Sequence, residues 1–174
     1  EEKKTESKEA EKTPQNNTKP LVEKIELCAP VSGTVKALYD VPDKTFAEKV
    51  LGDGAAIIPE EGKVYAPADG TVANIMDSKH GIMFVTDSGA EVLIHIGLDT
   101  VNLKGKYFKS YVSDGDKVKK GTLLVEFDLE AIKGEGYNLI TPMVVTNISD
   151  YIKAVCMEKE NTAINAGDKF LTVV

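Results

Sequence analysis

The chain carries one short pattern twice, and this repeat constrains the fold more than any other feature. Residues 29–35 and 66–72 both read Ala-Pro-x-x-Gly-Thr-Val. In each copy the proline stands where a strand needs no backbone donor, and we expect the glycine to provide the positive φ of a turn. Two equivalent strand–turn–strand units are therefore predicted. They favour a β-sandwich or barrel built partly from duplicated hairpins.

The rest of the chain from Leu21 onward has the same texture. Short runs rich in Val, Ile, Thr, Phe and Tyr alternate with turn signals, which lie at residues 31–33, 52–54, 69–70, 87–89 and 114–116. Helical stretches are few, with candidates at 128–132 and 150–155. Because 174 residues with 42% hydrophobic content can bury one core, residues 21–174 are predicted to form a single all-β domain. Its expected architecture is an antiparallel β-sandwich of the barrel-sandwich hybrid type with few short helices.

Residues 1–20 have a different composition, with Ala10 as their only hydrophobic residue. Such a segment cannot offset its ordering entropy by burial, so we expect a flexible linker or tail. An amphipathic membrane anchor is rejected because the segment has no apolar face. The chain starts at Glu1 and not at a methionine, which indicates a fragment, a processed form or a domain of a longer protein.

Charge and cysteine content exclude several classes. The net charge is −7 and no basic stripe is present, so nucleic acid is not expected as a partner. No apolar run reaches the roughly 20 residues that a membrane helix needs. Cys28 and Cys156 lack CxxC spacing and are predicted to be buried thiols in a reducing, cytoplasmic setting.

The two histidines of the chain flank one predicted hairpin. A turn centred between Asp87 and Ser88 pairs His80 directly with His95, which brings their Cβ atoms within about 5 Å. A shift of this centre by half a residue changes the pairing and can turn the two rings to opposite faces. The pattern therefore favours a histidine pair and leaves its register open.

Alternation along the second strand of this hairpin separates two faces. Val92, Ile94 and Ile96 would form one face, and Leu93, His95 and Gly97 the other. We expect Gly97 to leave room for the backbone of a partner beside His95.

Two adjacent imidazoles suit phosphoryl chemistry. A neutral imidazole is a good nucleophile near neutral pH. A second imidazole can donate a hydrogen bond to the phosphoryl oxygens where charge develops.

These residues resemble the glucose-type enzyme IIA domains of the bacterial phosphoenolpyruvate-dependent sugar phosphotransferase system. The most specific stretch is His-Ile-Gly-Leu-Asp-Thr-Val at 95–101, which is similar to the phosphorylation-site signature of that family. Further similar stretches lie at 29–35, 40–43, 46–49, 52–54, 66–72, 87–89, 92–94, 103–105, 127–129 and 141–142, and at His80. The resemblance implies a compact antiparallel β-sandwich and a phosphotransferase component of sugar transport.

The resemblance also implies partners and a direction of transfer. His95 would accept a phosphoryl group on Nε2 from the phosphocarrier HPr and pass it to a cysteine of a IIB domain. The IIB domain phosphorylates sugar entering through the membrane IIC permease, on the same or a separate chain. The domain would be cytoplasmic, either free or tethered to the membrane through a IIBC component.

Roles for further residues follow from the same resemblance. His80 would be the second imidazole, which stabilises the phosphoryl group. Ser78 stands where the family usually has a threonine that orients that ring, and it lacks the methyl group that restrains χ1. A partner-binding face would contain Asp43, Phe46, Leu93, Ile94, Gly97 and Asp99. For the two aspartates a plain turn role is equally open, and Phe46, Leu93 and Ile94 are also candidates for the packing beneath the face.

Three other functions remain open. A biotinyl or lipoyl carrier needs a lysine at a hairpin tip, and residues 87–89 offer none. A zinc peptidase needs three protein ligands, whereas the chain has two histidines and no His-x-His. A regulatory module that uses the same surface is compatible with phosphoryl transfer. No cofactor is expected and no metal is required, although His80 and His95 can bind zinc adventitiously or with a carboxylate lent by a partner. The sugar served is not readable from these residues.

Overall fold

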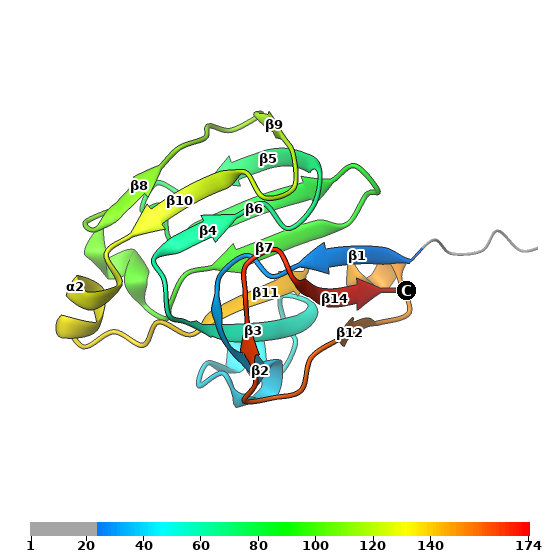
Figure 1. Cartoon of the computed structure of the whole chain (residues 1–174), viewed down its shortest axis with the longest axis horizontal. Coiled ribbons are helices and arrows are strands. Elements are labelled where there is room, and N and C mark those ends of the chain that lie inside the picture. The colour runs from blue at the N-terminus through cyan, green and yellow to red at the C-terminus, as the bar shows by residue number, and fades with distance from the viewer. Residues whose placement is uncertain (1–23) are drawn as a thin grey trace, which may run out of the picture.

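The computed structural model describes residues 24–174, which form antiparallel strands joined by tight turns (Figure 1). The tail predicted at residues 1–20 lies outside the described residues. The strands are β1 (Ile25–Cys28), β2 (Gly33–Ala37), β3 (Asp53–Pro59), β4 (Lys63–Tyr65), β5 (Gly70–Ile75), β6 (Gly81–Thr86), β7 (Glu91–His95), β8 (Phe108–Ser110), β9 (Lys117–Val118), β10 (Leu123–Phe127), β11 (Thr141–Val145), β12 (Ala154–Cys156), β13 (Ala163–Ile164) and β14 (Lys169–Val173). Every pairing among them is antiparallel, which confirms the predicted fold class.

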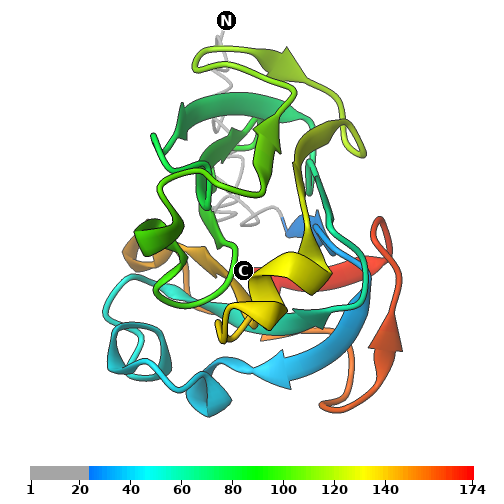
Figure 2. The ribbon, with the colours of Figure 1, turned by 90° about the vertical axis from the view of Figure 1, so that its left-hand side faces the viewer.

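The strands form three sheets. The largest has eight strands in the order β13-β2-β3-β11-β7-β6-β5-β9, and two three-stranded sheets have the orders β1-β14-β12 and β4-β10-β8. Figure 2 shows how the strands curve around the interior. That interior is filled by fully buried side chains from all three sheets, among them Leu27, Ile57, Phe84, Leu124 and Phe170.

The two copies of the repeated motif occupy equivalent positions. Each copy lies between two strands, β1 and β2 or β4 and β5. The N–H of Cys28 donates to the carbonyl of Pro67 at 2.9 Å, and the N–H of Tyr65 donates to the carbonyl of Pro30 at 2.8 Å. This reciprocal pair of hydrogen bonds confirms that the motif marks two equivalent units packed against each other.

The prediction of a positive φ at the motif glycines is wrong. Gly33 and Gly70 are absent from the residues with positive φ. Each lies at the start of a strand, where a side chain would collide with the carbonyl of the paired strand, Ile58 for Gly33 and Val85 for Gly70. Glycine is therefore required at these two positions because two backbones approach closely there, and not because a turn needs a positive φ.

Short helices interrupt the sheets. α1 (Lys44–Ala47) begins after Asp43 and α2 (Leu129–Gly134) after Asp128, each with the aspartate side chain accepting a backbone N–H. Three 3-10 turns are η1 (Leu38–Asp40), η2 (Thr100–Leu103) and η3 (Ile148–Asp150). α2 confirms the helix expected at 128–132.

The helix expected at 150–155 is wrong. After η3, the N–H groups of Ile152 and Lys153 donate to the carbonyl of Val174, and β12 then pairs with β14. Tertiary strand pairing therefore overrides the local helical pattern.

Cys28 is buried and Cys156 is half-buried, and both are free thiols. Burial raises the pKa of each thiol. Within residues 24–174, no helix has the length and apolar character needed to cross a membrane.

Candidate functional site

The hairpin of β6 and β7 has a register that differs from the predicted one. Gly81, and not His80, lies opposite His95. The turn is centred on Ser88: the N–H of Thr86 donates to the carbonyl of Ala90 at 2.9 Å, and Gly89 has φ +98°. A three-residue turn closed by a glycine in the left-handed region shifts the pairing by one residue. The predicted direct pairing of the two histidines is therefore wrong.

The two imidazoles nevertheless meet. Their ring centroids are 4.9 Å apart, and the rings stand edge to face at 83°. His80 lies just before β6, and Lys79 before it has φ +59°, so the alternation of the strand does not continue to His80. The carbonyl of His80 accepts the N–H of Ile96 at 2.7 Å, which fixes His80 beside the end of β7. The predicted proximity of the two histidines is confirmed. It results from the hydrogen bond at the end of β7 and not from direct cross-strand pairing.

The ring of His95 is oriented by its own chain. Its Nδ1 lies 2.6 Å from the carbonyl oxygen of Gly97. A carbonyl only accepts hydrogen bonds, so Nδ1 carries the proton and Nε2 keeps its lone pair. The ring of Phe46 packs against that of His95, with centroids 5.3 Å apart. His95 is therefore held in the tautomer that leaves Nε2 as the nucleophilic nitrogen.

Burial keeps both imidazoles neutral. Burial, with a smaller contribution from the neighbouring His95, lowers the pKa of His80 to about 4. Burial also lowers the pKa of His95, against the opposing effects of the Gly97 hydrogen bond and the carboxylates of Asp43 and Asp99. At neutral pH the pair therefore has a free nucleophilic nitrogen and no charge of its own.

The support predicted for His80 is not formed in this structure. The Nδ1 of His80 is buried without a hydrogen-bond partner among the described residues. Ser78 and His80 are separated by Lys79 alone, but no hydrogen bond joins the side chains of Ser78 and His80 in the described part of the chain. The orienting role of Ser78 stays a prediction.

A cavity of about 680 Å³ opens above the two histidines. Its apolar wall includes Phe46, Met76, Met83 and Leu93, and its rim includes Asp43 and Asp99. Val50 and Val101 line the same cavity and are 69% and 50% exposed. The site is thus an open apolar face that surrounds the histidine pair and has acidic groups at its edge.

The predicted partner residues occupy this face in part. Phe46 and Leu93 are mostly buried, belong to a small second cluster that also contains Leu38 and Leu98, and still line the cavity. Asp43 combines two roles, because its Oδ1 accepts the N–H of Thr45 at 2.9 Å while the residue lies at the cavity rim. Asp99 is exposed and has φ +58° at the start of η2.

Two predicted partner residues do not face the cavity. Ile94 has no exposed surface and packs in the main core, so it lies beneath the face and cannot contact a partner. The space expected at Gly97 is filled from within the chain. A side chain there would stand 2.7 Å from Cγ2 of Thr100 and 3.0 Å from the carbonyl oxygen of Asn138, and Gly97 has φ +74°. Internal packing and backbone conformation therefore require Gly97, not the approach of a partner.

Sequence reasoning missed several lining residues, four of which are Val or Met side chains. Met76, Met83, Val50 and Val101 come from four different segments and share no motif. In β6, Met83 points to the same face as Gly81, and Gly81 is paired with His95. The correct hairpin register would therefore have placed Met83 on the face of the histidines. Val50 and Val101 are exposed apolar residues, and exposure cannot be read from a sequence.

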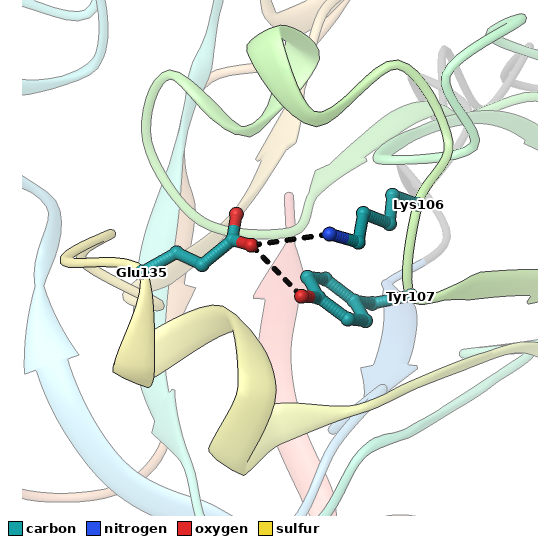
Figure 3. A network of polar contacts seen from close by, with 3 residues as sticks. All are labelled: Lys106, Tyr107 and Glu135. Atoms are coloured by element: carbon teal, nitrogen blue, oxygen red, sulfur yellow. Dashed lines mark hydrogen bonds and ion pairs between the residues drawn. The ribbon is translucent and has the colours of Figure 1, made fainter.

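The segment that follows His95 is anchored to α2 and its C-terminal extension. The hydroxyl of Tyr107 donates to Oε1 of Glu135 at 2.8 Å, and Nζ of Lys106 lies 3.4 Å from the same oxygen (Figure 3). The N–H of Asp128 also donates to the carbonyl of Tyr107 at 2.9 Å. These contacts join the end of the loop that begins at His95 to the segment that carries Asn138.

No group of three or more His, Cys, Asp or Glu side chains within residues 24–174 is arranged to hold a metal ion. The described side chains therefore offer a neutral imidazole pair and rim carboxylates as the chemistry of this site.

Comparison with known proteins gives consistent matches. The model of the family described as phosphoenolpyruvate-dependent sugar phosphotransferase system, EIIA 1, matches residues 25–151. A glucose-specific EIIA component of Halalkalibacterium halodurans is 46% identical over 84% of this chain and 83% of that protein. A beta-glucoside-specific EIIBCA component of Bacillus subtilis is 52% identical over 71% of this chain, and this match spans 20% of the relative.

A solved structure agrees with these sequence matches. The glucose permease IIA from Mycoplasma capricolum superposes with a TM-score of 0.77 at 32% sequence identity, over 86% of this chain and 96% of that one.

Proposed function

Because the chain belongs to the EIIA family of the phosphoenolpyruvate-dependent sugar phosphotransferase system, we propose that His95 is the residue that carries its phosphoryl group. Members of this family are phosphotransferase components, and the chain is a phosphoryl carrier of that system. The observation that carries the proposal is the contact of 2.6 Å between Nδ1 of His95 and the carbonyl of Gly97. It leaves Nε2 unprotonated beside the cavity.

The transfer step follows from this geometry. Nε2 of His95 attacks the phosphorus of the donor, so that the Nε2–P bond forms while the bond from phosphorus to the donor nitrogen breaks. The transition state spreads charge over three phosphoryl oxygens, and catalysis consists of positioning and electrostatic stabilisation. The ring of His80, 4.9 Å from that of His95, is close enough to donate a hydrogen bond to one of these oxygens.

The face around the histidines suits a protein donor. Its apolar wall and its acidic rim of Asp43 and Asp99 match a partner that presents an apolar patch with basic residues beside a phosphorylated side chain. We assign the donor as phosphorylated HPr and the acceptor as the cysteine of a IIB domain. The IIB domain and the IIC permease would be on the same or a separate chain, as the EIIBCA relatives illustrate.

The sugar is not set by this face. Relatives of similar identity are named for different sugars: beta-glucosides at 52%, glucosamine at 50% and glucose at 46%. Since these proteins share this domain, the choice of sugar belongs to the remaining parts of the system.

Phosphorylation with purified components tests the proposal. Incubation with phosphoenolpyruvate, enzyme I and HPr is expected to add one phosphoryl group, labile in acid and stable in alkali as an N-linked phosphohistidine is. His95→Ala should abolish the label, whereas His80→Gln should keep it and serves as the matched control. A label that persists in His95→Ala would refute the assignment.

A further inference from the structure

Three consecutive peptide groups after His95 are each fixed by a different partner. The N–H of Ile96 donates to the carbonyl of His80 at 2.7 Å, and the N–H of Leu98 donates to the carbonyl of Asn138 at 2.9 Å. Between them, the carbonyl of Ile96 accepts the hydroxyl of Thr100 at 2.5 Å. The middle contact is made by a side chain, and it can therefore be removed by substitution.

Two adjacent peptide groups set where the carbonyl of Gly97 points: the Gly97–Leu98 peptide, which Asn138 holds, and the middle peptide before it. That carbonyl shares a peptide plane with the N–H of Leu98, and this plane is joined to the middle one through Gly97 at φ +74°. The same carbonyl holds the Nδ1 proton of His95. A rotation of the middle peptide would change the torsion angles at Gly97 and so loosen the position of the carbonyl that selects the tautomer of His95.

Thr100 is built into this turn by both branches of its side chain. It has no exposed surface, although it is polar. Its hydroxyl reaches the Ile96 carbonyl, and its methyl carbon occupies the space beside Gly97. Buried hydroxyl groups are usually hydrogen-bonded, because burial of an unpaired hydroxyl lowers the free energy of unfolding.

We propose that Thr100 is a positioning residue, whose hydroxyl fixes the Ile96–Gly97 peptide so that the Gly97 carbonyl keeps the proton of His95 on Nδ1. Nε2 then stays free and aligned for the phosphoryl group. Thr100 does not line the cavity and acts through the backbone. The inference rests on the proposed role of His95 as the phosphoryl acceptor.

The two branches of Thr100 allow a clean test. Thr100→Val keeps the methyl and removes the hydroxyl, whereas Thr100→Ser keeps the hydroxyl and removes the methyl. Thr86→Val is the matched control, because Thr86 is also buried and hydrogen-bonded, through its Oγ1 and the N–H of Ala90, but lies at the far end of the same hairpin. Thermal unfolding identifies any variant that does not fold.

Two readouts are measured on each variant. Ring-nitrogen chemical shifts of His95 in the unphosphorylated protein report the tautomer. Single-turnover transfer from phosphorylated HPr over a range of HPr concentrations reports the maximal rate and the half-saturating concentration. In Thr100→Val we expect a larger Nε2–H population and a maximal rate about tenfold lower, with the half-saturating concentration unchanged, because alignment is lost and docking is not. Thr100→Ser and Thr86→Val should resemble the wild type in both readouts.

Several outcomes would overturn the proposal. They are a Thr100→Val variant with unchanged tautomer or unchanged rate, a Thr100→Ser variant as impaired as Thr100→Val, and a loss confined to the half-saturating concentration. If Thr100→Val does not fold, a wild-type His95 that carries its proton on Nε2 overturns it equally. Because the tautomer is measured without phosphate, failure of the label to reside on His95 refutes the proposed function separately.

Discussion

The two faces of strand β7 have different surroundings and different uses. On one face, Val92 and Ile94 are fully buried in the main core. On the other, Leu93 belongs to the small second cluster, and His95 is half-buried at the cavity. Side chains that alternate along one strand thus separate stability from function. The site can keep an apolar, open face because the core beneath it does not depend on that face.

Substitution of adjacent residues on β7 gives the largest expected contrast. Ile94→Ala should lower the free energy of unfolding by about 3–5 kcal/mol, because it leaves a closed cavity in the core. Leu93→Ala should cost about 2 kcal/mol, since its space is continuous with the open cavity. Denaturant unfolding of both variants measures the difference.

Transfer kinetics extend the same contrast. The folded fraction of Ile94→Ala should accept the phosphoryl group from HPr as the wild type does, whereas Leu93→Ala should need a higher HPr concentration because the apolar wall is reduced. Equal stability losses together with equal kinetics in the two variants would show that the faces are not separate.

Replacement of His80 tests the open face alone. His80→Gln should still be labelled at His95, but onward transfer to the IIB cysteine should fall by at least about 10²-fold, because glutamine cannot reproduce the position of the imidazole. Ser78→Ala should show the same defect more weakly. Single-turnover transfer from the labelled domain to purified IIB measures both. Equal rates for His80→Gln and the wild type would reduce His80 to a neighbour of the site.

The sequence predicted the antiparallel β fold and the histidine pair for physical reasons. Runs of β-branched residues, turn signals and the repeated motif act through neighbouring residues in the sequence, so strands and turns can be predicted from them. The hairpin register depended on whether the turn held two or three residues, which Asp87-Ser-Gly89 does not decide without tertiary contacts. The assignments of Ile94 and Gly97 to the face failed because burial and close approach involve residues distant in sequence, such as Asn138.

The dependence on pH gives the smallest expected effect and separates the two faces by charge. The core face of β7 has no titratable side chain, whereas burial holds the pKa of His80 down to about 4 from its ordinary 6.5. An unfolded chain therefore binds a proton at this position that the folded chain rejects, so the contribution to stability is complete above about pH 6.5 and decreases as the pH falls toward 4. The thermal midpoint of the wild type should decline from pH 7.5 to 5.5, and His80→Gln should flatten part of that decline. The rate of labelling should fall to half of its neutral-pH value only at a pH below 6.5, because burial also lowers the pKa of His95 and protonation of Nε2 removes the nucleophile. A labelling rate that halves at pH 6.5, or a thermal midpoint with the same pH profile in both proteins, would show that the imidazoles are solvated like those of an exposed loop.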